Sequence, residues 1–342
     1  MSIRSTVYRA LPVAMVVLLL SGCAGGEPRV ALFSYNGADP YIATFVTQIE
    51  QEAAGRFGLT VYDARNSQIL QNEQIAGALR ERPNLVIVNP VDRLGAYSII
   101  RHLREWDTPV IFFNREPLAR DLDLWDRAYY VGARAKQSAR LQAELVMELF
   151  GNDPTALNGH DANGDGRIQT IILKGEQGHQ DAEIRTAELL AAFEARRFRL
   201  DVLAVEVANW SRDEAYAAMR DLLRSHGDAL ELVISNNDAM ALGAIARMRQ
   251  DGYFADENNN GRVDADDHSW LPVVGIDGID EAVEQIESGY LYGTVVNDSQ
   301  RMAAAIAELA EVIVGERAAA DLSVPLSNQT YVWVDYRPFV FE

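Results

Sequence analysis

The chain has 342 residues, 48% of them hydrophobic and 24% charged, an ordinary balance for a folded protein that excludes disorder as the default. Its formal net charge of −19 at pH 7 repels phosphate backbones and anionic membranes, which argues against nucleic acid as a partner. The length exceeds what one compact core usually takes and favours two lobes. The single cysteine, Cys23, excludes a disulfide within the chain.

The first residues form a targeting segment. Two arginines precede a short apolar run over residues 11–20, which is too short to cross a bilayer comfortably. The sequence LSGC at residues 20–23 resembles the lipobox of bacterial lipoproteins, in which the cysteine is lipidated and becomes the first mature residue. This resemblance implies a signal peptide over residues 1–22, a lipidated tether over residues 23–28, and an exported protein anchored to the cell membrane through Cys23. An ordinary signal peptide followed by an unmodified cysteine is the alternative.

From residue 29 onward, short apolar strands alternate with amphipathic helices, which predicts parallel sheets covered by helices on both faces. The strands predicted for the first half are 30–36, 59–65, 84–90, 109–117 and 128–133, and the helices 40–57, 68–80 and 92–106. The later strands are 168–173, 202–207, 230–235, 273–277 and 290–298, and the later helices 134–150, 180–197, 212–226, 238–249, 278–288 and 300–314. We expect an α/β fold with two Rossmann-like lobes joined by a hinge of several segments.

One lobe is predicted from residues 29–133 with 297–328, and the other from 134–296 with 329–342. In parallel sheets, ligands bind beyond the carboxyl ends of the strands, and polar residues follow many of the predicted strands here. Each such residue alone is more often a helix cap or turn former than a ligand. No Gly-x-Gly-x-x-Gly follows the first strand and no Walker loop is present, so a nucleotide site is not expected.

Three segments carry a family resemblance. They are GEQGHQDAEIR at residues 175–185, NNDAM at 236–240 and FNREP at 113–117. Together they closely resemble bacterial galactose/glucose-binding proteins, the substrate-binding subunits of methyl-galactoside ABC importers, over almost the whole mature chain. The resemblance implies a type I periplasmic binding protein fold and a binding protein that is not an enzyme.

The family's sugar-contacting residues match positions here one by one, and the resemblance implies that these residues form the sugar site. They are Asp39, Tyr41, Asn114, His179, Asp181, Arg185, Trp210, Asn237, Asp277 and Asn297. Carboxylates, amides and a guanidinium satisfy sugar hydroxyls, and two aromatic rings cover the apolar sugar faces. In the family the counterpart of Asp39 meets the 4-hydroxyl and both 4-epimers are accepted, so glucose and galactose are both expected.

Residues 161–169 have the alternating oxygen ligands of a calcium loop, with Gly166 at the sharp turn. The loop lacks an acid at its twelfth position. In the family a distant glutamate supplies that ligand, and Glu231 matches it. The expected calcium ligands are Asp161, Asn163, Asp165, the Arg167 carbonyl, Gln169 and Glu231. A structural role is expected, and a metal-free Asn/Gly turn is the alternative.

A second loop lies in an inserted segment, residues 251–270, where the family passes directly from helix to strand. It has the full calcium-loop pattern, with an aspartate at position twelve. The expected ligands are Asp256, Asn258, Asn260, the Arg262 carbonyl, Asp264 and Asp267. A solvated acidic loop without metal is the alternative.

Three functions are compatible with these features. The favoured one is capture of D-galactose or D-glucose for an ABC permease. Presentation of the same closed complex to a chemoreceptor is the alternative, because family members do both. An exported glycosidase would need paired carboxylates flanking a glycosidic bond and an open subsite, whereas the matched cluster encloses a monosaccharide.

Overall fold

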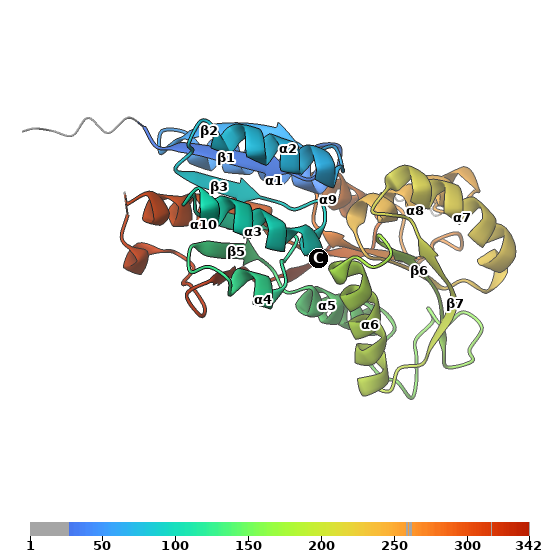
Figure 1. Ribbon diagram of the computed structural model, residues 1–342. Coiled ribbons are helices and arrows are strands. Elements are labelled where there is room, and N and C mark those ends of the chain that lie inside the picture. Colours follow the sequence, from blue (N-terminus) through green and yellow to red (C-terminus); the bar gives the residue numbers. More distant parts are fainter. Residues whose placement is uncertain (1–26, 258, 260–261, 316, 342) are drawn as a thin grey trace, which may run out of the picture.

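The computed structural model describes residues 27–257, 259, 262–315 and 317–341. Within these residues the chain forms two α/β lobes that lie side by side, each built on a six-stranded sheet (Figure 1). The predicted signal peptide, Cys23 and most of the predicted tether lie outside the described residues, as do Asn258 and Asn260 of the inserted loop.

The sheet of the first lobe has the order β11-β5-β4-β3-β1-β2, and all its pairings are parallel. Its strands are β1 (Arg29–Ser34), β2 (Gly58–Asp63), β3 (Leu85–Val88), β4 (Val110–Phe113), β5 (Ala128–Gly132) and β11 (Tyr331–Trp333). Its helices are α1 (Pro40–Ala53), α2 (Gln68–Leu79), α3 (Ala96–Glu105), α4 (Ala119–Leu122) and α10 (Ser299–Val314), with short 3-10 turns η1 (Arg93–Gly95) and η3 (Ala319–Asp321).

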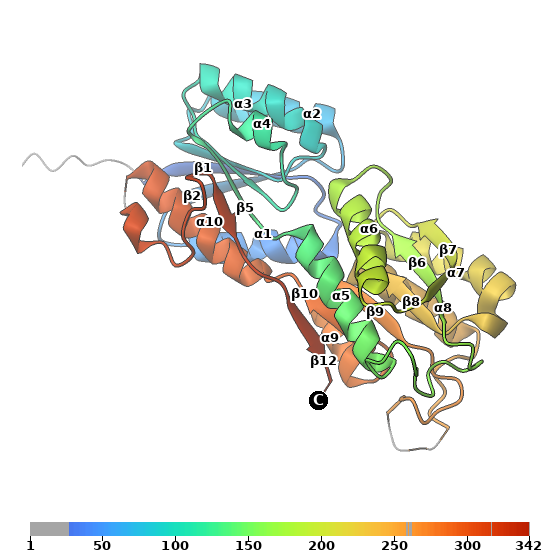
Figure 2. The ribbon, with the colours of Figure 1, turned by 90° about the horizontal axis from the view of Figure 1, so that it is seen from below.

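Helices cover this sheet on both faces, as Figure 2 shows with α1 and α10 on one side and α2 and α3 on the other. Strand β1 explains the arrangement, because its alternate side chains point to opposite faces. Val30 and Leu32 pack in the core beneath α1 and α10, whereas Ala31 and Phe33 pack beneath α2 and α3. A strand buried on both faces is apolar along its whole length, which is why the sequence shows a continuous run here.

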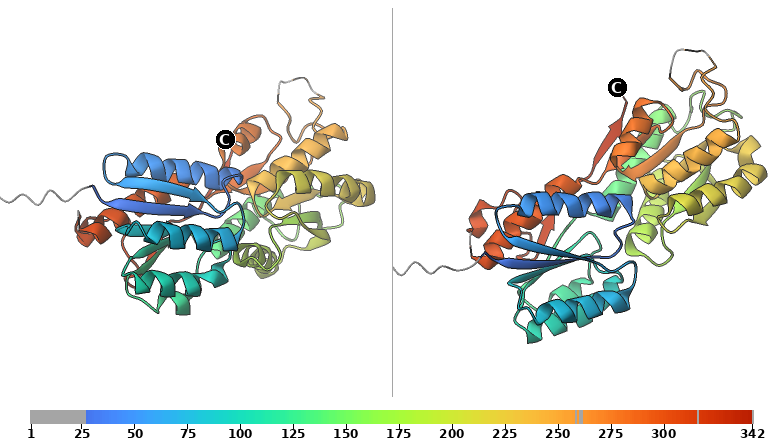
Figure 3. Two further views of the ribbon diagram at one scale, coloured as in Figure 1. Left: turned by 45° about the horizontal axis from the view of Figure 1, so that its top comes forward. Right: turned by 90° about the horizontal axis from the view of Figure 1, so that it is seen from above.

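The sheet of the second lobe repeats this plan with the order β12-β10-β9-β8-β6-β7. Its strands are β6 (Ile168–Lys174), β7 (Leu200–Val207), β8 (Leu232–Ser235), β9 (Val273–Asp277), β10 (Gly293–Val296) and β12 (Arg337–Val340). Its helices are α5 (Ala135–Leu149), α6 (Gln180–Ala195), α7 (Arg212–His226), α8 (Asp238–Gln250) and α9 (Asp280–Glu287), with the turn η2 (Gly227–Ala229). Helices α7 and α8 cover one face and α5 and α6 the other (Figure 3). The prediction of two α/β lobes is confirmed.

The chain crosses between the lobes after β5, after β10 and after β11. The predicted lobe boundary at residue 329 is therefore wrong, because β11 pairs with β5 in the first sheet. The last crossing instead follows Trp333. The sheet of the second lobe also differs from a purely parallel one, since β12 runs antiparallel to β10 at its edge. The sequence did not predict β11 or β12, because these edge strands are only partly buried and are not continuous apolar runs like β3 and β4.

Candidate functional site

A cavity lies between the lobes, at the carboxyl ends of strands from both sheets. Nine of the ten residues predicted for the sugar site line it. The full lining is Tyr35, Asp39, Tyr41, Ile42, Asn114, Arg115, His179, Asp181, Arg185, Trp210, Asn237 and Asp277. These residues come from segments spread over more than 240 positions of the sequence, so only the tertiary fold brings them together.

The first-lobe wall of the cavity is built on the start of α1 and the end of β4. Asp39 caps α1, with one carboxylate oxygen accepting a hydrogen bond from the Ile42 amide at 3.2 Å. Its other oxygen accepts from the Tyr35 hydroxyl. Asn114 has a φ of 59°, and its side-chain oxygen accepts from the Asn89 amide group at 3.4 Å. The helix caps that the sequence suggests are therefore real, and they coincide with the cavity wall.

The start of α6 supplies part of the second-lobe wall. His179 caps this helix, and its Nδ1 accepts a hydrogen bond from the Asp181 amide at 3.1 Å. Burial lowers the pKa of His179 to about 4, with Asp181 opposing the shift, so the imidazole is neutral at neutral pH. Since Nδ1 is an acceptor, the other ring nitrogen carries the proton and is a donor.

The buried floor of the cavity is formed by a guanidinium and a carboxylate of the second lobe. Arg185 is 4% exposed and donates to the Asn236 carbonyl at 2.6 Å and to the Tyr336 hydroxyl at 3.1 Å. Its terminal nitrogen lies 4.0 Å from an Asp277 oxygen, and its Nε is buried without a partner. Burial raises the pKa of Asp277, and Arg185 opposes that shift. Unpaired donor capacity on a buried cation is costly, so this floor favours a polar ligand.

Two aromatic side chains border the cavity. Tyr41 is buried on α1, and Trp210 lies on the other side with its ring edge-on to His179 at a centroid distance of 5.2 Å. Gly175 faces the Trp210 ring so closely that a Cβ there would lie 2.3 Å from it. Glycine at the end of β6 is therefore what leaves room for the indole.

Two more residues that line the cavity have unusual backbone conformations. Trp210 has a φ of 64° and Asp277 a φ of 132°, values that residues other than glycine rarely adopt. Conformations of this kind cost about 1–3 kcal/mol each and persist where the surrounding structure holds them, often at functional positions. Asn237, which caps α8, further fixes the Trp210 backbone by donating to its carbonyl at 3.4 Å.

Asn297 is the one predicted sugar-site residue that does not line the main cavity. It borders a neighbouring chamber together with Tyr41 and Asp277, which line both spaces. The main cavity itself has only about 40 Å³, whereas the mouth of the cleft beside it has about 570 Å³. A monosaccharide therefore needs a small rearrangement of the walls to fit at the centre.

Three residues of the first-lobe wall, Tyr35, Ile42 and Arg115, were not predicted from the sequence. The Arg115 guanidinium lies 3.9 Å from the centre of the Tyr35 ring and donates to the Val91 carbonyl. It also lies 3.5 Å from Glu176 of the second lobe. A second contact across the cleft joins Gln180 to the Glu116 carboxylate at 3.1 Å. For Tyr35 and Arg115 the available signal was position, because Tyr35 directly follows β1 and Arg115 lies two residues after the end of β4.

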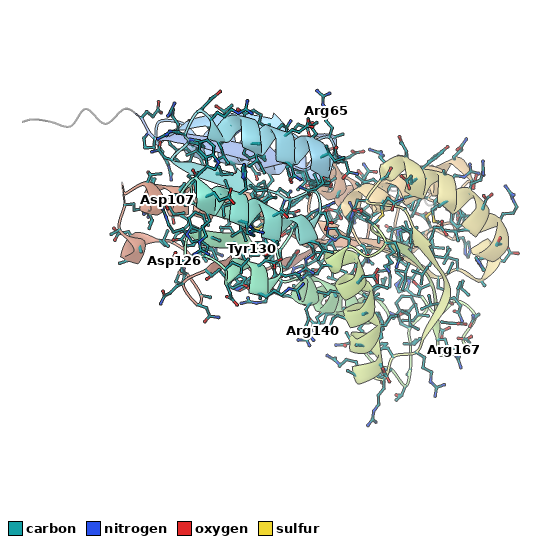
Figure 4. The ribbon with its side chains drawn as sticks, in the orientation of Figure 1. Arg65, Asp107, Asp126, Tyr130, Arg140 and Arg167 are labelled. Atoms are coloured by element: carbon teal, nitrogen blue, oxygen red, sulfur yellow. The ribbon has the colours of Figure 1, made fainter. Side chains whose placement is uncertain are left out.

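The first calcium-like loop lies at the far end of the second lobe from the hinge. Glu231, directly before β8, contacts this loop by accepting hydrogen bonds from the Ala162 amide at 2.8 Å and the Gln169 amide at 3.2 Å. Burial raises the pKa of Glu231, although those amides oppose it. The Arg167 side chain points outward into solvent (Figure 4), so only its carbonyl is available to the loop.

The chemistry of the first loop fits a calcium ion. The side-chain oxygen of Gln169 is buried and has no hydrogen-bond partner, which leaves an acceptor oxygen available as a ligand. Asp161 instead accepts from the Gly166 and Asp165 amides at 2.9 and 3.2 Å. Among the described residues, no group of three or more His, Cys, Asp or Glu side chains is placed to hold a metal. The predicted set depends on amide and carbonyl oxygens as well.

In the inserted loop, Asp267 joins the two ends of the described part through hydrogen bonds to backbone amides. Asp267 is 3% exposed, and its two oxygens accept from the Glu257 amide at 2.8 Å and the Asp264 amide at 3.1 Å. Of the other predicted ligands, Asp256, Arg262 and Asp264 are described, and Asn258 and Asn260 are not.

Among the helices that the structure describes, none is long and apolar enough to cross a membrane.

Two parallel-sheet lobes with a polar cavity at the strand ends between them define the class of two-lobed solute-binding proteins. Residues 30–317 match the family model described as a periplasmic binding protein domain. The chain therefore belongs to this family, and it is a binding protein and not an enzyme.

Individual relatives agree with this assignment. The chain is 31% identical over 316 residues to the D-galactose/methyl-galactoside binding periplasmic protein MglB of Haemophilus influenzae, covering 90% of this chain and 89% of that protein. It is 24% identical to a xylitol-binding protein of Mycolicibacterium smegmatis, covering 94% and 84%. A solved ABC transporter solute-binding protein of Bacillus halodurans, with bound myo-inositol, superposes with a TM-score of 0.74 at 25% identity, covering 92% and 95%.

Proposed function

We propose that this protein captures D-galactose and D-glucose in the interlobe cleft by hinge closure and delivers them to an ABC sugar importer. The observation that carries the proposal is the convergence of nine predicted sugar-site residues, from both lobes, on one cavity. The similarity to a galactose-binding relative over nine tenths of the chain supports the choice of hexose.

The cavity offers hydrogen-bonding groups that suit a ring of hydroxyls. Asp39, Asp181 and Asp277 supply acceptors, Arg185 and neutral His179 supply donors, and the amides of Asn114 and Asn237 supply both. Each sugar hydroxyl both donates and accepts, so a mixed set of this kind can satisfy every hydroxyl inside a dry cleft. Tyr41 and Trp210 add apolar ring area against the sugar's C–H faces.

Isothermal titration calorimetry against a panel of monosaccharides tests the proposal. We expect D-galactose and D-glucose to bind more tightly than ribose, xylitol and myo-inositol. Tight binding of one of the latter, with neither hexose bound, would overturn the choice of ligand but leave a solute-binding role. For the partner, loss of hexose uptake on gene deletion with chemotaxis intact supports the importer over presentation to a chemoreceptor.

We further propose a structural calcium ion in the loop over residues 161–169, closed by Glu231, and a second one in the inserted loop. Residues 161–169 and Glu231 would hold the first ion, which would neutralise carboxylates that otherwise repel each other. We also propose that the mature protein is anchored through lipid on Cys23. Mass spectrometry of the membrane-extracted protein tests this by detecting the added mass of the lipid on Cys23. A Cys23→Ala variant should be released in soluble form.

A further inference from the structure

A second chamber adjoins the cleft behind Tyr41 and Asp277. It has a volume of about 150 Å³ and lies where α1 of the first lobe faces the ends of β9 and β10 in the second. Thr44 and Gln48 of α1 form one side, and residues 278–280 and 296–300 form the other. Two of its lining residues, Tyr41 and Asp277, also line the main cavity, so the chamber lies directly beside the position of a bound sugar.

The chamber contains acceptor oxygens that have no donor. The side-chain oxygens of Gln48 and Asn297 and the hydroxyl of Tyr41 are all buried and lack a hydrogen-bond partner. Asn297 is 5% exposed and Tyr41 is 7% exposed, so bulk water does not compensate them. Each unpaired buried group of this kind costs about 1–3 kcal/mol. The amide oxygens can only accept, and they therefore call for a ligand group that donates.

The chamber is also electrically one-sided. Three carboxylates line it, from Asp277, Asp280 and Asp298, and no lysine or arginine is among its described lining residues. One oxygen of Asp298 accepts a hydrogen bond from the Arg301 amide at the start of α10. One oxygen of Asp277 lies 4.0 Å from a terminal nitrogen of Arg185, which lines the main cavity. The remaining field in the chamber is negative and favours a cation.

We infer that the chamber receives a protonated amino group, so that the cleft also binds amino sugars, in which an ammonium replaces a hydroxyl. An ammonium brings three donors, no acceptor and a positive charge, whereas a hydroxyl brings one donor and no charge. Water would supply donors but would leave the carboxylates uncompensated. This inference rests on the proposed function, since it assumes that the main cavity holds the sugar ring.

The test is calorimetric titration, at pH near 7, with D-glucosamine, D-galactosamine and 3-amino-3-deoxy-D-glucose beside D-glucose and D-galactose. We expect at least one amino sugar to bind about tenfold more tightly than its parent hexose, which corresponds to roughly 1.4 kcal/mol. If the hexoses bind and every amino sugar binds equally or more weakly, the inference fails alone. If none of the five sugars binds, the proposed function fails with it.

Two substitutions of Gln48, with opposite charges, distinguish binding in this chamber from binding at the sugar ring site. Gln48→Lys places a protein ammonium in the chamber and should lower amino-sugar affinity about tenfold while changing hexose affinity less than threefold. Gln48→Glu, of matched size, should retain or raise the amino-sugar preference. Equal loss for hexoses and amino sugars in Gln48→Lys, with an unchanged melting temperature, would contradict the assignment of the ammonium to this chamber.

Discussion

The second-lobe wall of the cleft contains a buried pair of opposite charges, whereas Asp39 and Asn114 of the first-lobe wall are half-buried. Arg185 and Asp277 are 4% and 7% exposed, and Arg185 is fixed by the Asn236 carbonyl and Tyr336. Asp39 is occupied in part with capping α1. The difference predicts that the second lobe is the more preorganised half, to which the sugar binds first and over which the first lobe closes.

The largest effect that tests this comparison is expected at Arg185. Arg185→Gln removes the fork of donors and leaves Asp277 buried without its cation. Truncating one partner of a buried charge pair costs about 2–5 kcal/mol, so calorimetry should show hexose affinity reduced about 30-fold or more. The thermal melt serves as a control for folding. A loss under tenfold in a folded variant would show that the second-lobe wall is not the dominant half.

Calcium removal is expected to act on the second lobe alone. A ligand present at 100 to 1,000 times its Kd stabilises the folded state by about 2.7–4.1 kcal/mol, and this stabilisation is lost in chelator. Hydrogen exchange should therefore show faster opening of β6 and β8, with β1 and β3 unchanged.

Glu231→Gln provides the matched variant, because it keeps the size of the side chain and removes its charge. In calcium, its melting temperature should lie close to that of the parent protein in chelator. It should be higher only by whatever stabilisation a calcium ion in the inserted loop provides. An identical melt of the parent protein with and without chelator would exclude structural calcium in both loops.

A smaller effect is expected at Asp39. Asparagine caps helices about as well as aspartate, so Asp39→Asn should keep the start of α1, while it removes the charge of the ligand contact and the oxygen that accepts from Tyr35. We expect about a tenfold loss of hexose affinity, or roughly 1.4 kcal/mol, with an unchanged melting temperature. A loss as large as that of Arg185→Gln would remove the distinction between the two walls.

The smallest effect is expected at the contact across the mouth of the cleft. Glu176 is 48% exposed and lies 3.5 Å from Arg115, and exposed pairs of this kind contribute about 0–1 kcal/mol. Glu176→Gln should change hexose affinity less than fivefold, and the change should appear in the dissociation rate measured by stopped-flow fluorescence. A larger change would make the mouth contact, and not the buried floor, the main determinant of closure.

Much of the fold was predictable because both sheets are buried on two faces. Strands such as 110–113 are then continuous apolar runs that stand out in any window. The third crossing was not predictable in the same way. Tyr331–Trp333 and Arg337–Val340 are partly buried edge strands without a continuous apolar run, and only pairing across the fold reveals which sheet each one joins.

The site was predictable where a residue lies in a recognisable motif. His179, Asp181 and Arg185 belong to one such segment, and the structure brings all three to the cavity. Residues whose role depends on a distant neighbour were not predictable. Tyr336 holds Arg185 from 151 positions away, and Arg115 stacks on Tyr35 across the first lobe. Asn297 shows the same limit, because its place beside the chamber depends on how α1 packs against β9.

The two final strands have a consequence for how the molecule is made. β11 completes the edge of one sheet and β12 the edge of the other, although only three residues separate them. The other strands of each sheet can pair without residues 331–340, but each sheet lacks one edge strand until this segment pairs. Pairing of this one segment therefore completes both sheets and the third crossing between the lobes together.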